Sequence, residues 1–86
     1  MPAVSIGIVP SKIYSATTGF NVDFIVQNLS GNNLYLIEEI SQALADGIKI
    51  IPNDYISKDN WDKDIILVAD GVTSDTRYLI QVKKKE

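Results

Sequence analysis

Few residues of this chain are suited to catalysis or metal binding. Its 86 residues include no histidine and no cysteine, which removes the usual general base and metal ligands and any Ser–His or Cys–His pair. The densest group of carboxylates lies in one segment and consists of Asp54, Asp59, Asp62 and Asp64. Oxygen-rich loops can hold Ca²⁺, but this spacing is not that of an EF-hand, and Lys58 and Lys63 offset the charge. We therefore expect a solvated loop here, and we assign no catalytic, cofactor-binding or metal-binding residue.

Three other polar motifs have simple structural explanations. Glu38 and Glu39 are adjacent, so on a strand they would face opposite sides and could not act as a carboxylate pair. The segment 28–30, Asn-Leu-Ser, matches a glycosylation sequon, a pattern that often occurs by chance. The lysines at 83–85 are expected to form a soluble tail.

Three apolar side chains are candidates for contact with a partner protein. Trp61 stands among polar residues, so it is either an exposed anchor for a partner or, as we prefer, a lid folded back on the core. Ile25 and Leu79 interrupt the polar sides of their segments, and Ile66 is a further apolar residue on an outward position. We take Trp61, Ile25 and Leu79 as the possible partner contacts, because a monomer would expose such groups.

Composition indicates one globular domain over residues 1–86. Hydrophobic residues make up 45% and charged residues 22%, close to globular averages. The net charge of −3 argues against nucleic-acid binding. The first nine residues lack the positive charge and apolar run of a secretory signal. No stretch approaches the ~18–20 apolar residues that a membrane span needs, so no membrane insertion is expected.

The segment 20–36 is the centre of the expected fold. Apolar residues alternate with polar ones from Phe20 to Val26, which is typical of a half-buried strand. Residues 28–33 are rich in Asn, Ser and Gly and predict a turn before the apolar run that begins at Leu34. For residues 34–47 we prefer a strand over 34–41 with a turn at 43–46, and a three-turn helix is the alternative.

Further strands are expected at 4–8, 12–14, 48–51, 65–69 and 77–83, with a polar loop at 57–64. This rhythm predicts an all-β sandwich or small barrel of about six to seven short antiparallel strands. The residues expected in its core are Val22, Phe24, Val26, Leu36, Ile50, Leu67, Ile80 and Val82.

A series of short motifs follows the chain from about residue 20 onward. They are VQNLSGN at 26–32, LADGIKII at 44–51, LVADG at 67–71 and TRYLIQV at 76–82. Their order resembles the immunoglobulin-like modules of bacterial, archaeal and viral surface proteins, such as the cell-adhesion-related CARDB-type domains. Ala45 stands where that family usually carries proline. The resemblance implies a single immunoglobulin-like β-sandwich with a binding or structural role and no catalytic residues.

We therefore expect a non-enzymatic structural protein without cofactors that binds other proteins, as a homo-oligomer or docked on a larger protein assembly. The fold type is used mostly outside cells, yet no export signal is seen. A virion component, such as a capsid decoration or cement protein assembled in the host cytoplasm, combines both traits. The alternative is an adhesion or carbohydrate-binding module of a larger protein at the cell surface.

Overall fold

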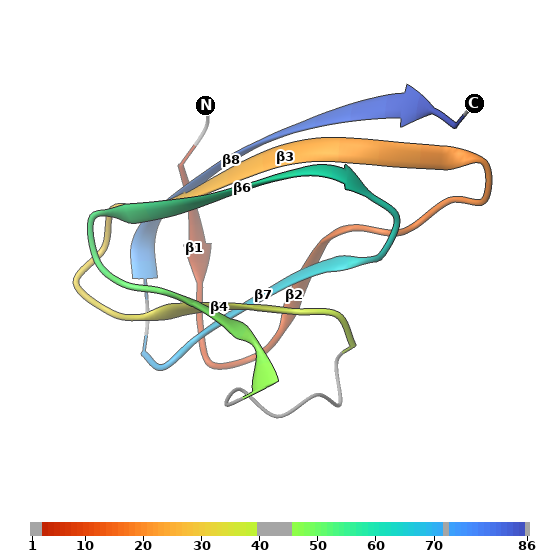
Figure 1. Ribbon diagram of the computed structural model, residues 1–86. Helices are drawn as coiled ribbons and strands as arrows, with labels where there is room; N and C mark the ends of the chain where they lie inside the picture. The colour runs from red at the N-terminus through yellow and green to blue at the C-terminus, as the bar shows by residue number, and fades with distance from the viewer. Residues whose placement is uncertain (1–2, 40–45, 72, 86) are drawn as a thin grey trace.

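The computed structural model describes residues 3–39, 46–71 and 73–85, and this part of the chain is built from β-strands (Figure 1). None of these residues forms a helix long and apolar enough to cross a membrane. The strands are β1 (Ala3–Ile6), β2 (Ser11–Tyr14), β3 (Phe20–Asn28), β4 (Leu34–Ile37), β5 (Ile48–Ile50), β6 (Asp54–Trp61), β7 (Ile65–Ala69) and β8 (Thr73–Lys84).

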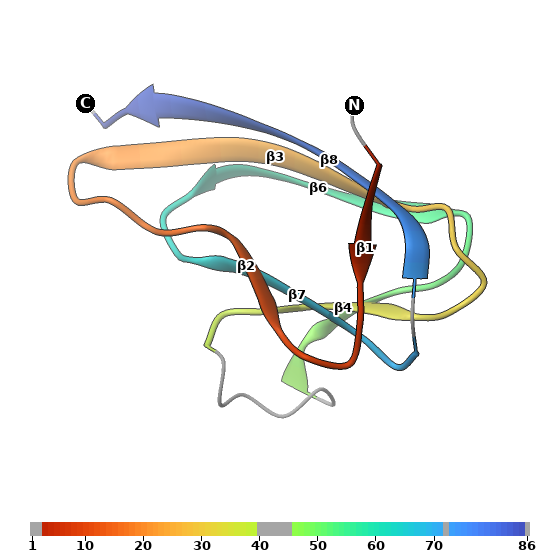
Figure 2. The ribbon, with the colours of Figure 1, turned by 180° about the vertical axis from the view of Figure 1, so that it is seen from behind.

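The strands form two antiparallel sheets that face each other, as the two opposite views in Figures 1 and 2 show. The first sheet has the order β1-β8-β3-β6 and the second has the order β2-β7-β4-β5. The pairs β1–β8, β2–β7, β3–β6 and β4–β5 are those of one long antiparallel ribbon folded back on itself. Winding this ribbon into two sheets gives the strand order of a jelly roll. The predicted all-β sandwich is therefore confirmed, and the strand order specifies its topology.

The core forms where the predicted alternation of β3 meets β8. Val22, Phe24 and Val26 are buried on the inner face, while the residues between them are only partly buried. Six of the eight predicted core residues are buried, and Ile80 packs partly buried against them. Val82 is an error of the prediction, because its side chain is 55% exposed. Val82 lies opposite Val22 on β3. This part of β8 extends beyond the residues that pair with β1, so among the described strands only β3 flanks it.

β7 is buried along its whole length because it lies between β2 and β4 in the second sheet. Ile65, Leu67 and Ala69 belong to the main core. We expected Ile66 to be available to a partner, which is wrong, since its side chain is only 1% exposed. It packs with Ile37 and Val68 in a second apolar cluster.

The segment that follows the turn at 28–33 is a strand, but it is shorter than the predicted strand over 34–41. β4 ends at Ile37, and Glu38 and Glu39 are exposed in a bend. A three-turn helix beginning at Leu34 is therefore excluded. The turn expected at 43–46 lies outside the described residues except for Asp46.

The polar loop predicted at 57–64 is wrong, because most of it belongs to the eight-residue strand β6. β6 pairs with β3 on one side only, so it is an edge strand of the first sheet. An edge strand meets water along its free margin and on its outer face, so it can be largely polar and still form a ladder. Asp59 and Asn60 are accommodated in this way, both of them exposed.

Candidate protein-docking face

The outer face of β8, β3 and β6 carries an apolar centre on the surface of the sandwich. Ile25 on β3 lies directly opposite Leu79 on β8 and, on its other side, opposite Ser57 on β6. Leu79 is 60% exposed and Ile25 is half-buried beside it. These residues line a shallow groove of about 250 Å³ together with polar neighbours, namely Asp23, Asp59 and Gln81. The two side chains that the sequence singled out on these strands are therefore brought together.

An exposed aromatic ring extends this apolar centre along β6. Tyr55 is 59% exposed and lies opposite Gln27 on β3. Gln27 is two residues from Ile25, so it lies on the same face of the sheet. Gln27 in turn pairs with Arg77 on β8, so polar side chains flank the apolar ones. We call Ile25, Leu79, Tyr55 and the residues that line the groove the docking face. An apolar centre within a polar margin is the usual composition of a protein interface.

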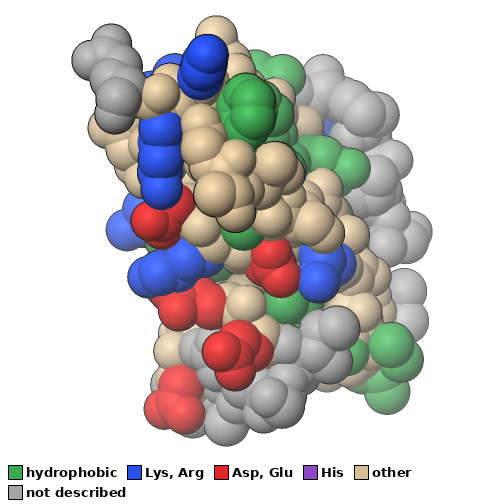
Figure 3. Space-filling view, turned by 90° about the vertical axis from the view of Figure 1, so that its right-hand side faces the viewer, with side chains coloured by type: hydrophobic (Ala, Val, Ile, Leu, Met, Phe, Trp, Pro, Cys, Tyr) green, Lys and Arg blue, Asp and Glu red, His purple; other side chains and the backbone are tan. Residues whose placement is uncertain are grey.

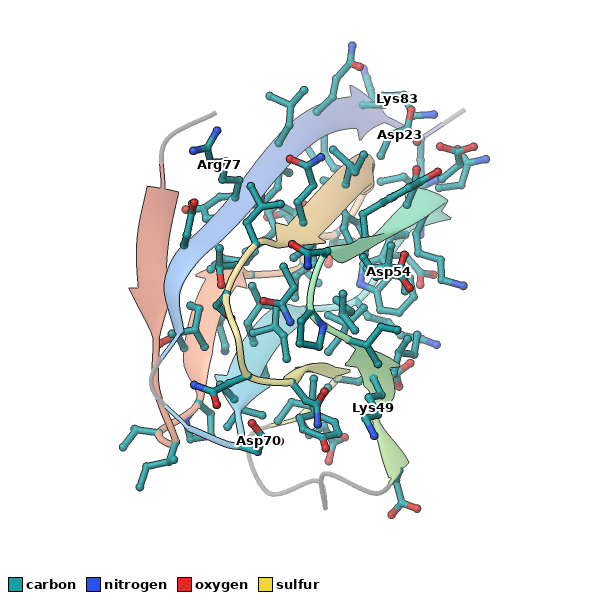
Figure 4. All side chains as sticks on the ribbon, turned by 90° about the vertical axis from the view of Figure 1, so that its left-hand side faces the viewer. Asp23, Lys49, Asp54, Asp70, Arg77 and Lys83 are labelled. Carbon is teal, nitrogen blue, oxygen red and sulfur yellow. The ribbon has the colours of Figure 1, made fainter. Side chains whose placement is uncertain are left out.

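Ion pairs hold the polar margin of the docking face in place. Lys83 Nζ lies 2.9 Å from Asp23 Oδ1 and donates a hydrogen bond to Asn60 Oδ1 at 3.0 Å. Figure 4 shows Asp23 and Lys83 side by side at one end of the first sheet. Figure 3 views this end of the sandwich, where acidic and basic side chains alternate along one margin. Further pairs at this end are Lys12–Asp64, Lys63–Glu38 and Lys85–Asp62.

Two of these aspartates have a pKa below the ordinary range of the residue. The pKa of Asp23 is lowered chiefly by the hydrogen bond that its Oδ1 accepts from the Asn60 backbone N–H, and then by Lys83. The pKa of Asp64 is lowered chiefly by the Ala16 backbone N–H, and then by Lys12. Both carboxylates thus bind segments distant in the chain, and only their ionised forms accept these bonds fully.

We expect the fold to lose stability in acid through these two groups. A carboxyl whose pKa is lower in the folded state binds more protons when unfolded, so its contribution is complete above about pH 5 and is lost as the pH falls below about 4. Urea unfolding as a function of pH should show this loss, and Asp23→Asn should make the profile flatter. An Asp23→Asn profile as steep as that of the wild type would assign the acid sensitivity to other groups.

Trp61 does not join Ile25 and Leu79, because it lies on the inner face at the end of the sandwich. Its ring meets Phe24 edge to face, with centroids 5.5 Å apart and planes at 80°. Its Nε1 donates a hydrogen bond to the Asp64 carbonyl oxygen at 3.2 Å, and Lys63 Nζ lies 5.4 Å from the ring centroid. This geometry favours the preferred interpretation of Trp61 as a lid on the core.

The carboxylates considered as a Ca²⁺ loop are spread over different surfaces. Asp54 begins β6 and Asp59 lines the docking face, while Asp62 pairs with Lys85 after the end of β8 and Asp64 pairs with Lys12 of β2. Within the described residues, no group of three or more Asp, Glu, His or Cys side chains is placed to hold a metal ion.

Asn28 has a structural role that sequence reasoning missed. Its side chain is fully buried, and its Nδ2 donates hydrogen bonds to the backbone oxygens of Asn32 at 2.7 Å and Ile50 at 2.9 Å. Its Oδ1 accepts hydrogen bonds from the Ser30 backbone N–H at 3.1 Å and hydroxyl at 2.7 Å. The sequon asparagine thus fastens the β3–β4 turn to β5. The run of Asn and Ser over 28–33 was the only signal of this role.

Comparison of the chain with protein-family models, curated proteins and solved structures gives no match. The proposals that follow therefore depend on the chain's own surface and topology.

Proposed function

We propose that the protein is a non-enzymatic structural component that binds another protein through its docking face. The observation that carries the proposal is the apolar centre formed by Ile25, Leu79 and Tyr55 on the outside of the first sheet. Burying apolar surface against a partner contributes roughly 25 cal/mol per Å², so water-exposed Leu79 and Tyr55 side chains favour association. Aromatic residues at the centre of such a face often contribute most of the binding energy.

The partner that we propose is the protein shell of a virion, on which this chain acts as a decoration or cement protein. The support is the strand order, because the eight-stranded jelly roll is widely used for viral capsid domains. One fold serves many functions, so binding to the shell depends on the docking face itself. Paired charges around the apolar centre suit a contact of this kind, since they fix orientation on a rigid lattice.

The alternative is a carbohydrate-binding or adhesion module of a cell-surface protein. Jelly rolls also form lectin domains. The specific observation in its favour is the groove, where Asp23, Asp59 and Gln81 offer polar groups beside the apolar floor of Ile25. A sugar would use these groups for hydrogen bonds, whereas a protein partner would use chiefly Leu79 and Tyr55.

We expect Leu79→Asp to weaken binding to the partner shell by about 10- to 100-fold, because a charge would be buried at the centre of the contact. The fold should be unaffected, since Leu79 points into water. The matched control is Val82→Asp, which places the same charge at an exposed aliphatic position on the opposite face of β8. Binding should survive this change. The measurement is co-sedimentation with shells assembled from the major capsid protein of the same genome, with circular dichroism of both variants.

Two outcomes would contradict the proposal. If the wild-type protein does not sediment with the shells, the capsid partner is wrong. If Leu79→Asp binds as well as the wild type does, the docking face is wrong. Binding to glycans that is lost in Asp59→Asn would support the carbohydrate-binding alternative.

A further inference from the structure

We propose that the free edge of β6 pairs with β6 of a second copy of this chain, antiparallel and with Ile56 opposite Ile56. The two first sheets then form one continuous sheet across a twofold axis. This inference goes beyond the proposed function, because it identifies a second copy as a partner and uses a strand edge instead of the docking face.

Among the strands that the structure describes, none pairs with the edge of β6 opposite β3 (Figure 4). The direction of its backbone groups follows from two hydrogen bonds at the end of β3. The Asn28 carbonyl accepts a bond from Asn53 N at 2.7 Å, and the Leu29 N–H donates to Asp75 O at 3.0 Å. Backbone groups alternate along a strand, so Asn28, Val26 and Phe24 direct theirs to β6, whereas the residues between them direct theirs to β8.

Tyr55 and Ser57 therefore direct their N–H and C=O groups to the free edge, because they lie opposite Gln27 and Ile25. A local contact agrees with this assignment, since the Tyr55 N–H donates to Asp54 Oδ1 at 2.8 Å instead of to β3. An antiparallel partner strand must place residues with outward backbone groups opposite each other. Few registers of β6 against itself meet this condition.

Charge selects among these registers. With Tyr55 opposite Ser57 of the second copy, Asp54 lies opposite Lys58 on both sides of the twofold axis. In the register with Tyr55 opposite Tyr55, Asp54 lies opposite Ile56 instead. In the register with Ser57 opposite Ser57, Lys58 lies opposite Ile56. A further step sets the two Lys58 ammonium groups against each other. The first register alone gives two cross-strand ion pairs, with Ile56 facing itself between them.

Within the described residues, neither Asp54 nor Lys58 has an ion-pair partner in the single chain, so both charges are available. A lysine that faces inward on an edge strand normally prevents unwanted pairing. Here Asp54 supplies its complement in one register, so the edge excludes other strands and accepts its own copy.

The pairing is short, because Asn53 and Asn60 have left-handed φ angles of 65° and 55° and bound the regular part of β6. Two residue pairs of Tyr55 with Ser57 each exchange two hydrogen bonds in such a ladder. On pairing, the Tyr55 N–H exchanges Asp54 Oδ1 for the Ser57 carbonyl of the second copy, and Asp54 turns to Lys58. The dimer is therefore weak in dilute solution and is favoured where copies are concentrated on a surface. It also places Tyr55 of one copy beside Ser57 of the other, which joins the two docking faces.

The test uses two charge variants, Lys58→Glu and Asp54→Lys. Each alone sets like charges opposite each other, so each should dimerise at least about 10-fold more weakly than the wild type. A mixture of the two restores both ion pairs, so heterodimers should form where neither variant self-associates. Sedimentation equilibrium at roughly 10–500 µM, a range that suits a weak contact, is the measurement. Absence of a wild-type dimer over this range, or a mixture that associates no better than its components, would overturn the proposal.

A second measurement tests the register. The chain has no cysteine, so Ile56→Cys introduces a single thiol. Directly opposite residues in a non-hydrogen-bonded pair have Cα atoms about 4.5 Å apart, within disulfide range. Mild oxidation should cross-link Ile56→Cys and leave the control, Ser57→Cys, mainly uncross-linked. Cross-linking of Ser57→Cys instead would show a different register. Leu79→Asp should leave this dimer intact, so failure of the docking proposal and failure of this one are distinguishable.

Discussion

Replacing Phe24 by alanine is expected to lower the free energy of unfolding by about 3–5 kcal/mol, because removal of a large buried ring leaves a cavity. Phe24 lies in the middle of β3, and its side chain is only 3% exposed. It also holds the ring of Trp61 at the end of the core. Small domains have a total stability near the low end of about 5–15 kcal/mol, so this single change removes a large share.

Urea unfolding followed by the fluorescence of Trp61, the single tryptophan, measures this effect. Phe20→Ala is the matched control, because Phe20 stands on the same strand with an exposed side chain, and its loss should cost less than about 1 kcal/mol. Where Phe24→Ala does not fold, Phe24→Leu should give a measurable, smaller loss. A Phe24→Ala protein that unfolds at the wild-type urea concentration would contradict the assignment of Phe24 to the core.

The strands that sequence reasoning found are those with a clear apolar pattern, either alternating or continuous. β3 could be predicted because polar and apolar residues alternate along it, and β7 because it is apolar throughout. β6 could not, since an edge strand that is mostly exposed carries no apolar pattern. Val82 follows the alternation of β8 but lies where, among the described strands, only β3 flanks β8. Local sequence does not contain this fact of topology.

The docking face could be predicted in part. Ile25 and Leu79 each break a local pattern, which marks them as apolar groups on the outside. Their pairing depends on the register of β3 against β8, strands separated by most of the chain. Ile66 breaks its pattern in the same way, yet it is buried with Ile37 and Val68, because the outer face of the second sheet carries its own apolar cluster. Outward position alone therefore does not decide exposure.

Asn28→Ala is expected to destabilise the fold by about 2–4 kcal/mol, a loss close to that of a core truncation. The alanine cannot donate to the carbonyl oxygens of Asn32 and Ile50, and it cannot accept from Ser30. The bond to Ile50 is buried, so water cannot easily replace it, and an unsatisfied buried acceptor costs about 1–3 kcal/mol. The β3–β4 turn would also lose its attachment to β5.

Chemical denaturation of Asn28→Ala beside Ser30→Ala separates these contributions. Ser30→Ala removes the hydroxyl bond to Asn28 Oδ1 and two longer contacts of the hydroxyl with the Asn32 backbone, at 3.3 and 3.4 Å, but it leaves the amide bonds of Asn28 to Asn32 and Ile50 in place. A loss of about 1 kcal/mol is therefore expected. Asn28→Asp keeps the acceptor but sets a buried carboxylate against two carbonyl oxygens, which raises its pKa in the folded state. This variant should therefore become more stable as the pH falls, opposite to the acid sensitivity expected from Asp23 and Asp64. Equal stability of Asn28→Ala and Ser30→Ala would show that the amide of Asn28 does not hold the turn.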